Sequence, residues 1–164
     1  VNQFTARASN SFKNFNINLG ATLIGSKSML YNPDGTDVSD DLDHYLYVFQ
    51  LNSAVNYQII PLDLSFALNY KYNGREEEFL QANTTDGDLT ITKGITEPYH
   101  WLDFSIKKQF FKRQTEITIG ARNLLDVKKL TTSTTASHGS EPLNTLTMGY
   151  GRSYFIKLKH QLNF

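Results

Sequence analysis

The segment from Leu62 to Tyr72 reads Leu-Asp-Leu-Ser-Phe-Ala-Leu-Asn-Tyr-Lys-Tyr, and its side chains alternate between two kinds. Every second residue is apolar or aromatic, and the residues between them are small or polar. Successive side chains of a β-strand point to opposite faces, whereas a helix of 3.6 residues per turn would mix the two sets. The segment therefore predicts a strand with one apolar and one polar face.

The same alternation recurs along most of the chain. Five further strands are predicted at about residues 15–23, 45–57, 100–110, 115–127 and 150–164, and residues 1–8 predict the end of a seventh. Strands of about 10 to 15 residues exceed the usual 5 or 6 of soluble sheets and suit the roughly 9 to 11 needed to cross a bilayer. The sequence predicts an all-β fold, an antiparallel transmembrane β-barrel segment of six or seven long strands.

One side of each predicted strand should face lipid. The apolar positions expected there are Phe15, Ile17, Leu19, Leu64, Phe66, Leu68, Phe104, Ile106, Ile117 and Ile119. Many aromatic residues stand near strand ends, where amphipathic rings favour the lipid–water interface.

The predicted connections alternate in length. Short links fall at residues 9–14, 58–61 and 111–114, and long polar links fall at residues 30–44, 73–99 and 128–149. Outer-membrane barrels have short periplasmic turns and long extracellular loops. The long links are therefore expected outside the cell.

Composition excludes several classes of protein. The chain has 164 residues, 16 basic and 16 acidic side chains and no cysteine. A net charge of zero argues against a general nucleic-acid binder, and the lack of cysteine excludes disulfides, cysteine-ligated zinc and thiol catalysis. No window reaches the roughly 18 apolar residues of a membrane-spanning helix. Because the chain begins at Val1 without an export signal, it is expected to be mature, trimmed or a fragment.

Two stretches near the C-terminus point to a family. Ile117–Val127 reads Ile-Thr-Ile-Gly-Ala-Arg-Asn-Leu-Leu-Asp-Val, and Gly151–Leu158 reads Gly-Arg-Ser-Tyr-Phe-Ile-Lys-Leu. They resemble the last strands of TonB-dependent outer-membrane receptors, which usually carry Gly-x-x-Asn-Leu-Phe-Asp in the penultimate strand. Leu125 stands where Phe is commonest. The second stretch is most similar to Bacteroidetes-type receptors, and the resemblance is strong only over residues 99–164.

This resemblance implies a 22-strand barrel around an N-terminal plug domain. Residues 1–164 would form the C-terminal part of the barrel, with the plug absent from this chain. The whole receptor would bind a scarce nutrient (an iron chelate, cobalamin, glycan or peptide) and import it with TonB-coupled energy, without catalysis or a cofactor. Expected partners are the plug and remaining barrel strands, the TonB complex, the outer-membrane assembly machinery, lipid and lipopolysaccharide; a surface lipoprotein is a further candidate, and nucleic acid is not expected.

Three groups of candidate functional residues follow. The first would stack on a ligand or form an interfacial aromatic girdle: Tyr31, Tyr99, Trp101 and Tyr150. The second, on the polar side of the strands, would contact the plug, line the ligand path or simply hydrate the wall: Asp103, Lys107, Glu116, Arg122, Lys157 and Lys159. The third would form the assembly signal of the last strand: Tyr154, Ile156, Leu158, Leu162 and Phe164.

Several other readings remain open. The acidic loop at residues 32–43 could hold calcium or be a solvated turn, and its spacing is not that of an EF-hand. The four histidines show no metal-site spacing, and no nucleophile-elbow motif occurs, so neither a metal nor a catalytic residue is assigned. Two rival classes are a small closed outer-membrane barrel with a structural or enzymatic role and a soluble β-sandwich binding module.

Overall fold

The computed structural model describes the chain except for residues 28–44, 84–88, 112, 136–142, 148–149 and 162–164. The described elements are strands and one short 3-10 turn, η2 (Ile60–Leu62). The strands are β1 (Asn2–Phe12), β2 (Phe15–Ser26), β3 (Leu46–Ile59), β4 (Leu64–Asn73), β5 (Glu76–Asn83), β6 (Leu89–Thr96), β7 (Tyr99–Phe110), β8 (Thr115–Arg122), β9 (Lys129–Thr135), β10 (Leu143–Thr147) and β11 (Ser153–His160). No helix in this part of the chain is long and apolar enough to cross a bilayer.

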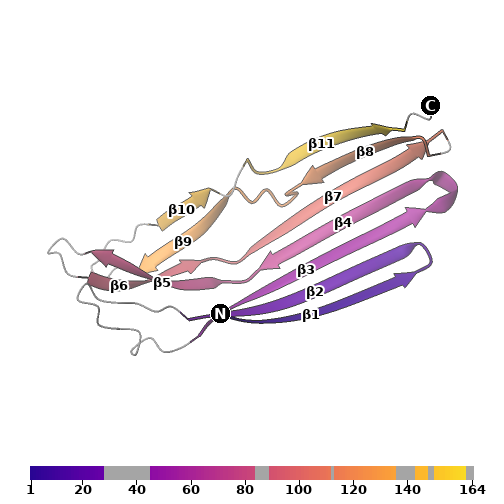
Figure 1. The fold of residues 1–164 in the computed structure, drawn as a ribbon. Coiled ribbons are helices and arrows are strands. Elements are labelled where there is room, and N and C mark those ends of the chain that lie inside the picture. Colours follow the sequence, from indigo (N-terminus) through magenta and orange to yellow (C-terminus); the bar gives the residue numbers. More distant parts are fainter. Residues whose placement is uncertain (28–44, 84–88, 112, 136–142, 148–149, 162–164) are drawn as a thin grey trace.

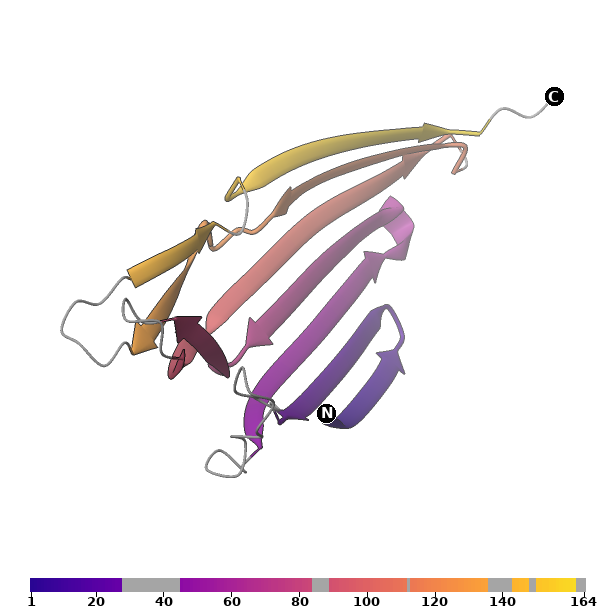
Figure 2. The ribbon, with the colours of Figure 1, turned by 60° about the vertical axis from the view of Figure 1, so that its left-hand side comes forward.

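Seven strands form one antiparallel sheet in the order β1-β2-β3-β4-β7-β8-β11. The strands lie side by side along a curved wall, with β1 and β11 at its two edges (Figures 1 and 2). β1 and β11 pair on one side only, with β2 and β8 respectively. The sheet is therefore open and does not close into a barrel within the described residues.

The predicted alternation is in phase from strand to strand. Phe66 of β4 is paired with Tyr57 of β3 and with Ile106 of β7, and Ile106 is paired with Ile119 of β8. Ile119 in turn faces Ile156 of β11. A slip of one residue would move the apolar set of a strand to the other face. The register thus confirms that the ten positions predicted to face lipid share one side of the sheet.

The described residues contain almost no protein core. Leu46, Val48 and Ala121 are the buried hydrophobic residues among them. On the apolar face Phe4 is 69% exposed and Ile156 is 74% exposed. The second sheet continues from one end of the wall and does not cover this face (Figures 1 and 2). The two packed layers of a soluble β-sandwich are absent from this part of the chain.

The long polar links predicted at residues 73–99 and 128–149 join strands that are neighbours in the wall, but they contain strands of their own, which were not predicted. The hairpins β5-β6 and β9-β10 lie there and form a second sheet in the order β10-β9-β6-β5. β6 is paired with β9, with Thr96 opposite Thr132, so backbone hydrogen bonds link the two connections. Sequence alternation missed these strands because pairing between two hairpins needs no apolar face. We call the end of the wall that carries this sheet the long-loop end, and the opposite end the short-turn end.

Several predicted strand limits also need correction. β1 continues to Phe12, and its turn is only residues 13 and 14, with Lys13 at φ 50°. β8 ends at Arg122 instead of residue 127, because Asn123 and Asp126 adopt φ values of 53° and 60°. Positive φ values interrupt a strand, and asparagine and aspartate tolerate them better than most residues.

Candidate functional site

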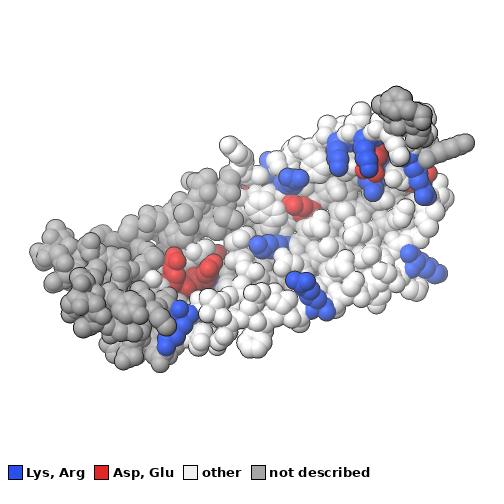
Figure 3. All heavy atoms as spheres, in the orientation of Figure 1, with Lys and Arg blue, Asp and Glu red and all other residues white. Residues whose placement is uncertain are grey.

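The polar face of the seven-stranded sheet is predominantly basic. Register places six basic and two acidic side chains of its strands on this face: Arg7, Lys71, Lys107, Arg122, Lys157, Lys159, Asp103 and Glu116. Figure 3 shows basic side chains spread across this sheet with fewer acidic ones among them. The lumen candidates predicted from sequence therefore do share one face.

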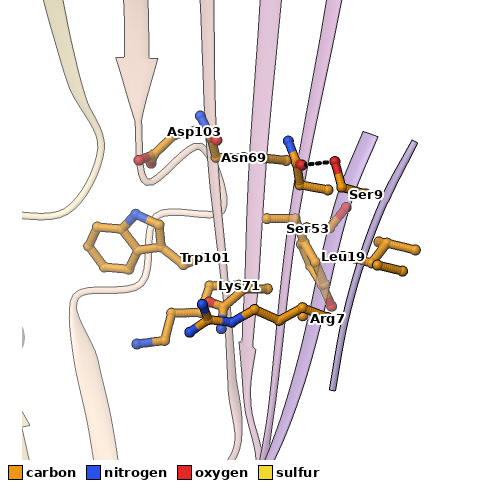
Figure 4. A pocket seen from close by; sticks show the side chains of 14 residues that line it. Arg7, Ser9, Leu19, Ser53, Asn69, Lys71, Trp101 and Asp103 are labelled. Carbon is orange, nitrogen blue, oxygen red and sulfur yellow. Dashed lines mark hydrogen bonds between the residues drawn. The ribbon is translucent and has the colours of Figure 1, made fainter. Parts of the chain in front are cut away.

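A hollow of about 580 Å³ lies on this face near its centre. Side chains from five strands line it: Arg7 and Ser9 of β1, Asn18 of β2, Asn52 of β3, Asn69 and Lys71 of β4, and Trp101 and Asp103 of β7. Ser9 donates a hydrogen bond of 2.7 Å to the Asn18 side-chain oxygen (Figure 4). The hollow thus combines two cations, several amides and an indole.

Register explains how Arg7 and Lys71 come to share the hollow. Arg7 is paired with Gly20, Gly20 with Asn52, and Asn52 with Lys71, so they form one row across the sheet. Strand spacing sets the backbones of Arg7 and Lys71 about 14 Å apart. A Cβ on Gly20 would lie 3.9 Å from Cγ of Arg7, so the Arg7 side chain lies over this glycine. Figure 4 shows it extending across the sheet toward the Lys71 side chain.

The acidic side chains of the polar face are already engaged. Asp103 Oδ1 accepts the backbone N–H of Asn123 at 2.8 Å. Glu116 Oε2 lies 3.8 Å from Lys107 Nζ. Arg122 lies over the Phe155 ring, 5.2 Å from its centroid. Within the described residues, five of the six cations of this face have no acidic partner: Arg7, Lys71, Arg122, Lys157 and Lys159.

A tight turn follows β8 at the long-loop end of the wall. Asn123 is 1% exposed, and its side chain donates to the Val127 carbonyl at 2.8 Å and accepts the Val127 N–H at 2.9 Å. Asp126 accepts the backbone N–H of Arg152 at 2.9 Å and pairs with Lys128 at 3.1 Å. The Arg152 hydrogen bond, followed by that of Lys128, lowers the pKa of the Asp126 carboxyl. This turn, residues 122–128, fixes the start of β11 beside β8.

Of the four predicted ligand-stacking residues, Tyr99 and Trp101 lie on the same face of β7. Trp101 lines the hollow, and Tyr99 lies two residues before it on the same strand, half-buried. Tyr150 is fully exposed in the bend before β11. Tyr31 lies outside the described residues.

The predicted assembly strand shows the expected alternation as far as it is described. Tyr154, Ile156 and Leu158 face the apolar side and are about 70% exposed, between 68% and 74%. Leu162 and Phe164 lie outside the described residues, as does the acidic loop at residues 32–43.

Sequence reasoning missed two features of this face. Arg7 was overlooked because β1 has only a weak apolar alternation, although its odd residues from Gln3 to Ser11 are all polar. Asn123 was noticed only as part of a motif. Its buried turn was not predicted, and the signal available was an asparagine and an aspartate three residues apart at the end of a strand.

Long antiparallel strands, an uncovered apolar face, a polar face and alternating short and long connections define the wall of an outer-membrane β-barrel protein. The family model for the outer membrane protein beta-barrel family matches residues 4–145. The chain belongs to this family, and the outer membrane is its location. No curated protein and no solved structure matches the chain.

Proposed function

We propose that residues 1–164 form the C-terminal barrel wall of a TonB-dependent receptor that imports a scarce nutrient across the outer membrane. The nutrient would be an iron chelate, cobalamin, a glycan or a peptide. The chain would act as wall and binding surface, not as an enzyme. A plug domain and further barrel strands would complete the receptor.

The observation that carries this proposal is the open sheet. Seven strands with antiparallel neighbours leave β1 and β11 running in the same direction. Closing this sheet on itself would require a parallel pair, whereas bacterial single-chain outer-membrane barrels have even numbers of antiparallel strands. An unpaired strand edge is also not tolerated in lipid. An odd number of additional strands is therefore required, as a 22-strand barrel would provide.

The turn after β8 gives the second support. The stretch that resembles the receptor motif, Ile117–Val127, forms most of β8 and this turn. Asp126 accepts the backbone N–H of Arg152 in the other resembling stretch. The two similar stretches thus form a single contact between the last two strands. This coherence favours the receptor over a small closed barrel.

Import should be tested with the complete protein in its outer membrane. A strain lacking the gene and a complemented strain would be compared for uptake of labelled iron chelate, cobalamin, oligosaccharide or peptide, with and without a protonophore. The proposal expects accumulation of one of these solutes only in the complemented strain, abolished by the protonophore because TonB coupling uses the proton gradient. If small solutes only equilibrate across the membrane, and the protonophore does not change their uptake, the protein is a passive closed barrel and the proposal is overturned.

A further inference from the structure

We infer that the hollow around Arg7, Lys71 and Trp101 is the docking site of an acidic segment of the same polypeptide. We call this the Arg7–Lys71 hollow. The inference rests on the proposed function in one respect, namely that a polypeptide segment fills the barrel. It adds the place on the wall where this segment is held and the chemistry that holds it.

The charges of the wall require an acidic occupant. Arg7 and Lys71 both line the hollow and have no acidic partner among the described residues. The nearby Asp103 carboxylate already accepts the Asn123 N–H at 2.8 Å. A segment packed against this face would displace water from the two cations, and a desolvated cation needs a carboxylate or an equivalent acceptor. Neutral or basic segments would leave both charges uncompensated.

The position of the hollow favours a resident segment over a captured solute. Arg7 is the sixth of the eleven residues of β1, and Asn52 is the seventh of the fourteen residues of β3. At about 3.4 Å per residue, Asn52 lies roughly 20 Å from the long-loop end of its strand. A solute arriving from outside first meets the rim, whereas fixed charges at mid-height face whatever occupies the interior at rest.

The remaining lining suits a polypeptide. The side-chain amides of Asn52 and Asn69 each carry both a donor and an acceptor, as a peptide group does. The Trp101 indole adds a further N–H donor and a flat apolar surface. Because Gly20 has no side chain, the Arg7 side chain lies over it and extends toward Lys71, which brings the two cations to one side of the occupant. Acidic side chains would meet the two cations while the peptide backbone meets the amides.

Site-specific photo-crosslinking in the complete receptor tests this inference. A benzoylphenylalanine residue replaces Asn52, between Arg7 and Lys71 in the same row. After irradiation of intact cells, mass spectrometry identifies the attached peptide. The matched control places the same residue at Val55, on the opposite face of β3. We expect the Asn52 position to capture a peptide of the same polypeptide that contains Asp or Glu, and the Val55 position to capture none.

Charge variants show whether the acidic group is what holds the segment. The double substitution Arg7→Gln and Lys71→Gln should lower the yield of the Asn52 crosslink by about fivefold or more, because close charge pairs dominate such contacts. The charge-preserving double substitution Arg7→Lys and Lys71→Arg should retain most of it. Capture of no peptide, of a solute only or of a peptide without acidic residues would overturn the inference, as would a yield unchanged by neutralisation. Protonophore-sensitive uptake with a failed crosslink would support the proposed function and overturn this inference. A crosslink to an acidic peptide without energised uptake would support the inference and overturn the proposed function.

Discussion

The backbone N–H of Asn123 donates a hydrogen bond to Asp103 Oδ1 at 2.8 Å and thereby ties the turn after β8 to the neighbouring strand β7. A second bond from the backbone N–H of Leu124 to the Leu102 carbonyl, at 2.7 Å, continues the ladder beyond the end of β8. Asp126 of the same turn then binds the Arg152 backbone. The last three strands of the sheet are thus joined at the long-loop end by one turn.

Replacing Asn123 should destabilise the barrel. Asn123→Ala removes both side-chain bonds to Val127, leaving a partly buried N–H and a partly buried carbonyl unpaired, at a cost of about 2 to 3 kcal/mol. Alanine at a φ of 53° adds backbone strain, which Asn123→Gly would avoid while losing the same bonds. Urea unfolding of the complete protein in lipid measures the change. Stability equal to that of the exposed control Asn56→Ala would show that the turn contributes nothing.

A charge on the apolar face should be far more costly than one on the polar face. Leu68, near the middle of β4, belongs to the predicted lipid side, and Ala67 belongs to the opposite side. We expect Leu68→Arg to reduce stability by roughly 2 to 4 kcal/mol, as charges near the bilayer midplane do, and Ala67→Arg to have little effect. The same unfolding assay compares the two. Equal losses would mean that the two faces are assigned wrongly.

The two ends of the wall should face opposite sides of the outer membrane. Glu97 is exposed beside the second sheet, and Arg113 is exposed in a short turn, where it pairs with Asp63. The chain has no cysteine of its own. A cysteine at Glu97 should react with an impermeant thiol reagent on intact cells, whereas one at Arg113 should react only after permeabilisation. The reverse pattern would invert the topology.

The pairing of β6 with β9 should be capturable as a disulfide. Thr96 and Thr132 are direct partners in this pair. Introduced cysteines at these two positions should form a disulfide, seen as faster migration on a non-reducing gel, because direct partners bring their Cβ atoms within bonding range. The pair Thr96→Cys and Thr134→Cys, two residues out of register, serves as the control. A disulfide formed equally well in both would show that these two connections are not held in one register.

The terminal aromatic residue should matter for assembly more than for binding. Phe164 follows β11 by four residues in the sequence, and β11 must pair with a further strand to protect its edge. We expect Phe164→Ala to lower the amount of complete receptor in the outer membrane while the assembled fraction binds normally. Quantitative blotting of outer-membrane fractions measures this. Normal amounts with lost uptake would instead place the residue in transport.

The main sheet could be predicted from the alternation of apolar and polar residues, because this alternation arises within each strand separately. Each strand of the main sheet from Phe15 onward must present one side to lipid. The side of the sheet on which Ile17 and Ile106 lie can therefore be predicted from the alternation in the sequence. Pairing partners of β6 and β9 depend instead on backbone contacts between segments about forty residues apart, which leave no apolar period. For the same reason the second sheet escaped prediction.

The candidate site was predictable only in part. Trp101, Asp103 and Lys107 were placed on the polar face by their parity in β7, and the register confirms that placement. The grouping of Trp101 and Asp103 with Arg7 across five strands required the register of every intervening pair. The sequence alone predicts on which face of the sheet a side chain lies. Which side chains of neighbouring strands it lies beside depends on the register between the strands.

The central claim is that this sheet is one section of a larger, closed barrel whose polar face lines the interior. Cryo-electron microscopy of the complete protein in a lipid nanodisc tests it most directly. The account predicts that β1 and β11 each pair with a strand outside this sheet, that an odd number of strands separates them, and that Leu68 and Ile119 face lipid while Arg7 and Lys71 face the interior. Direct pairing of β1 with β11, or Arg7 and Lys71 turned toward lipid, would contradict it.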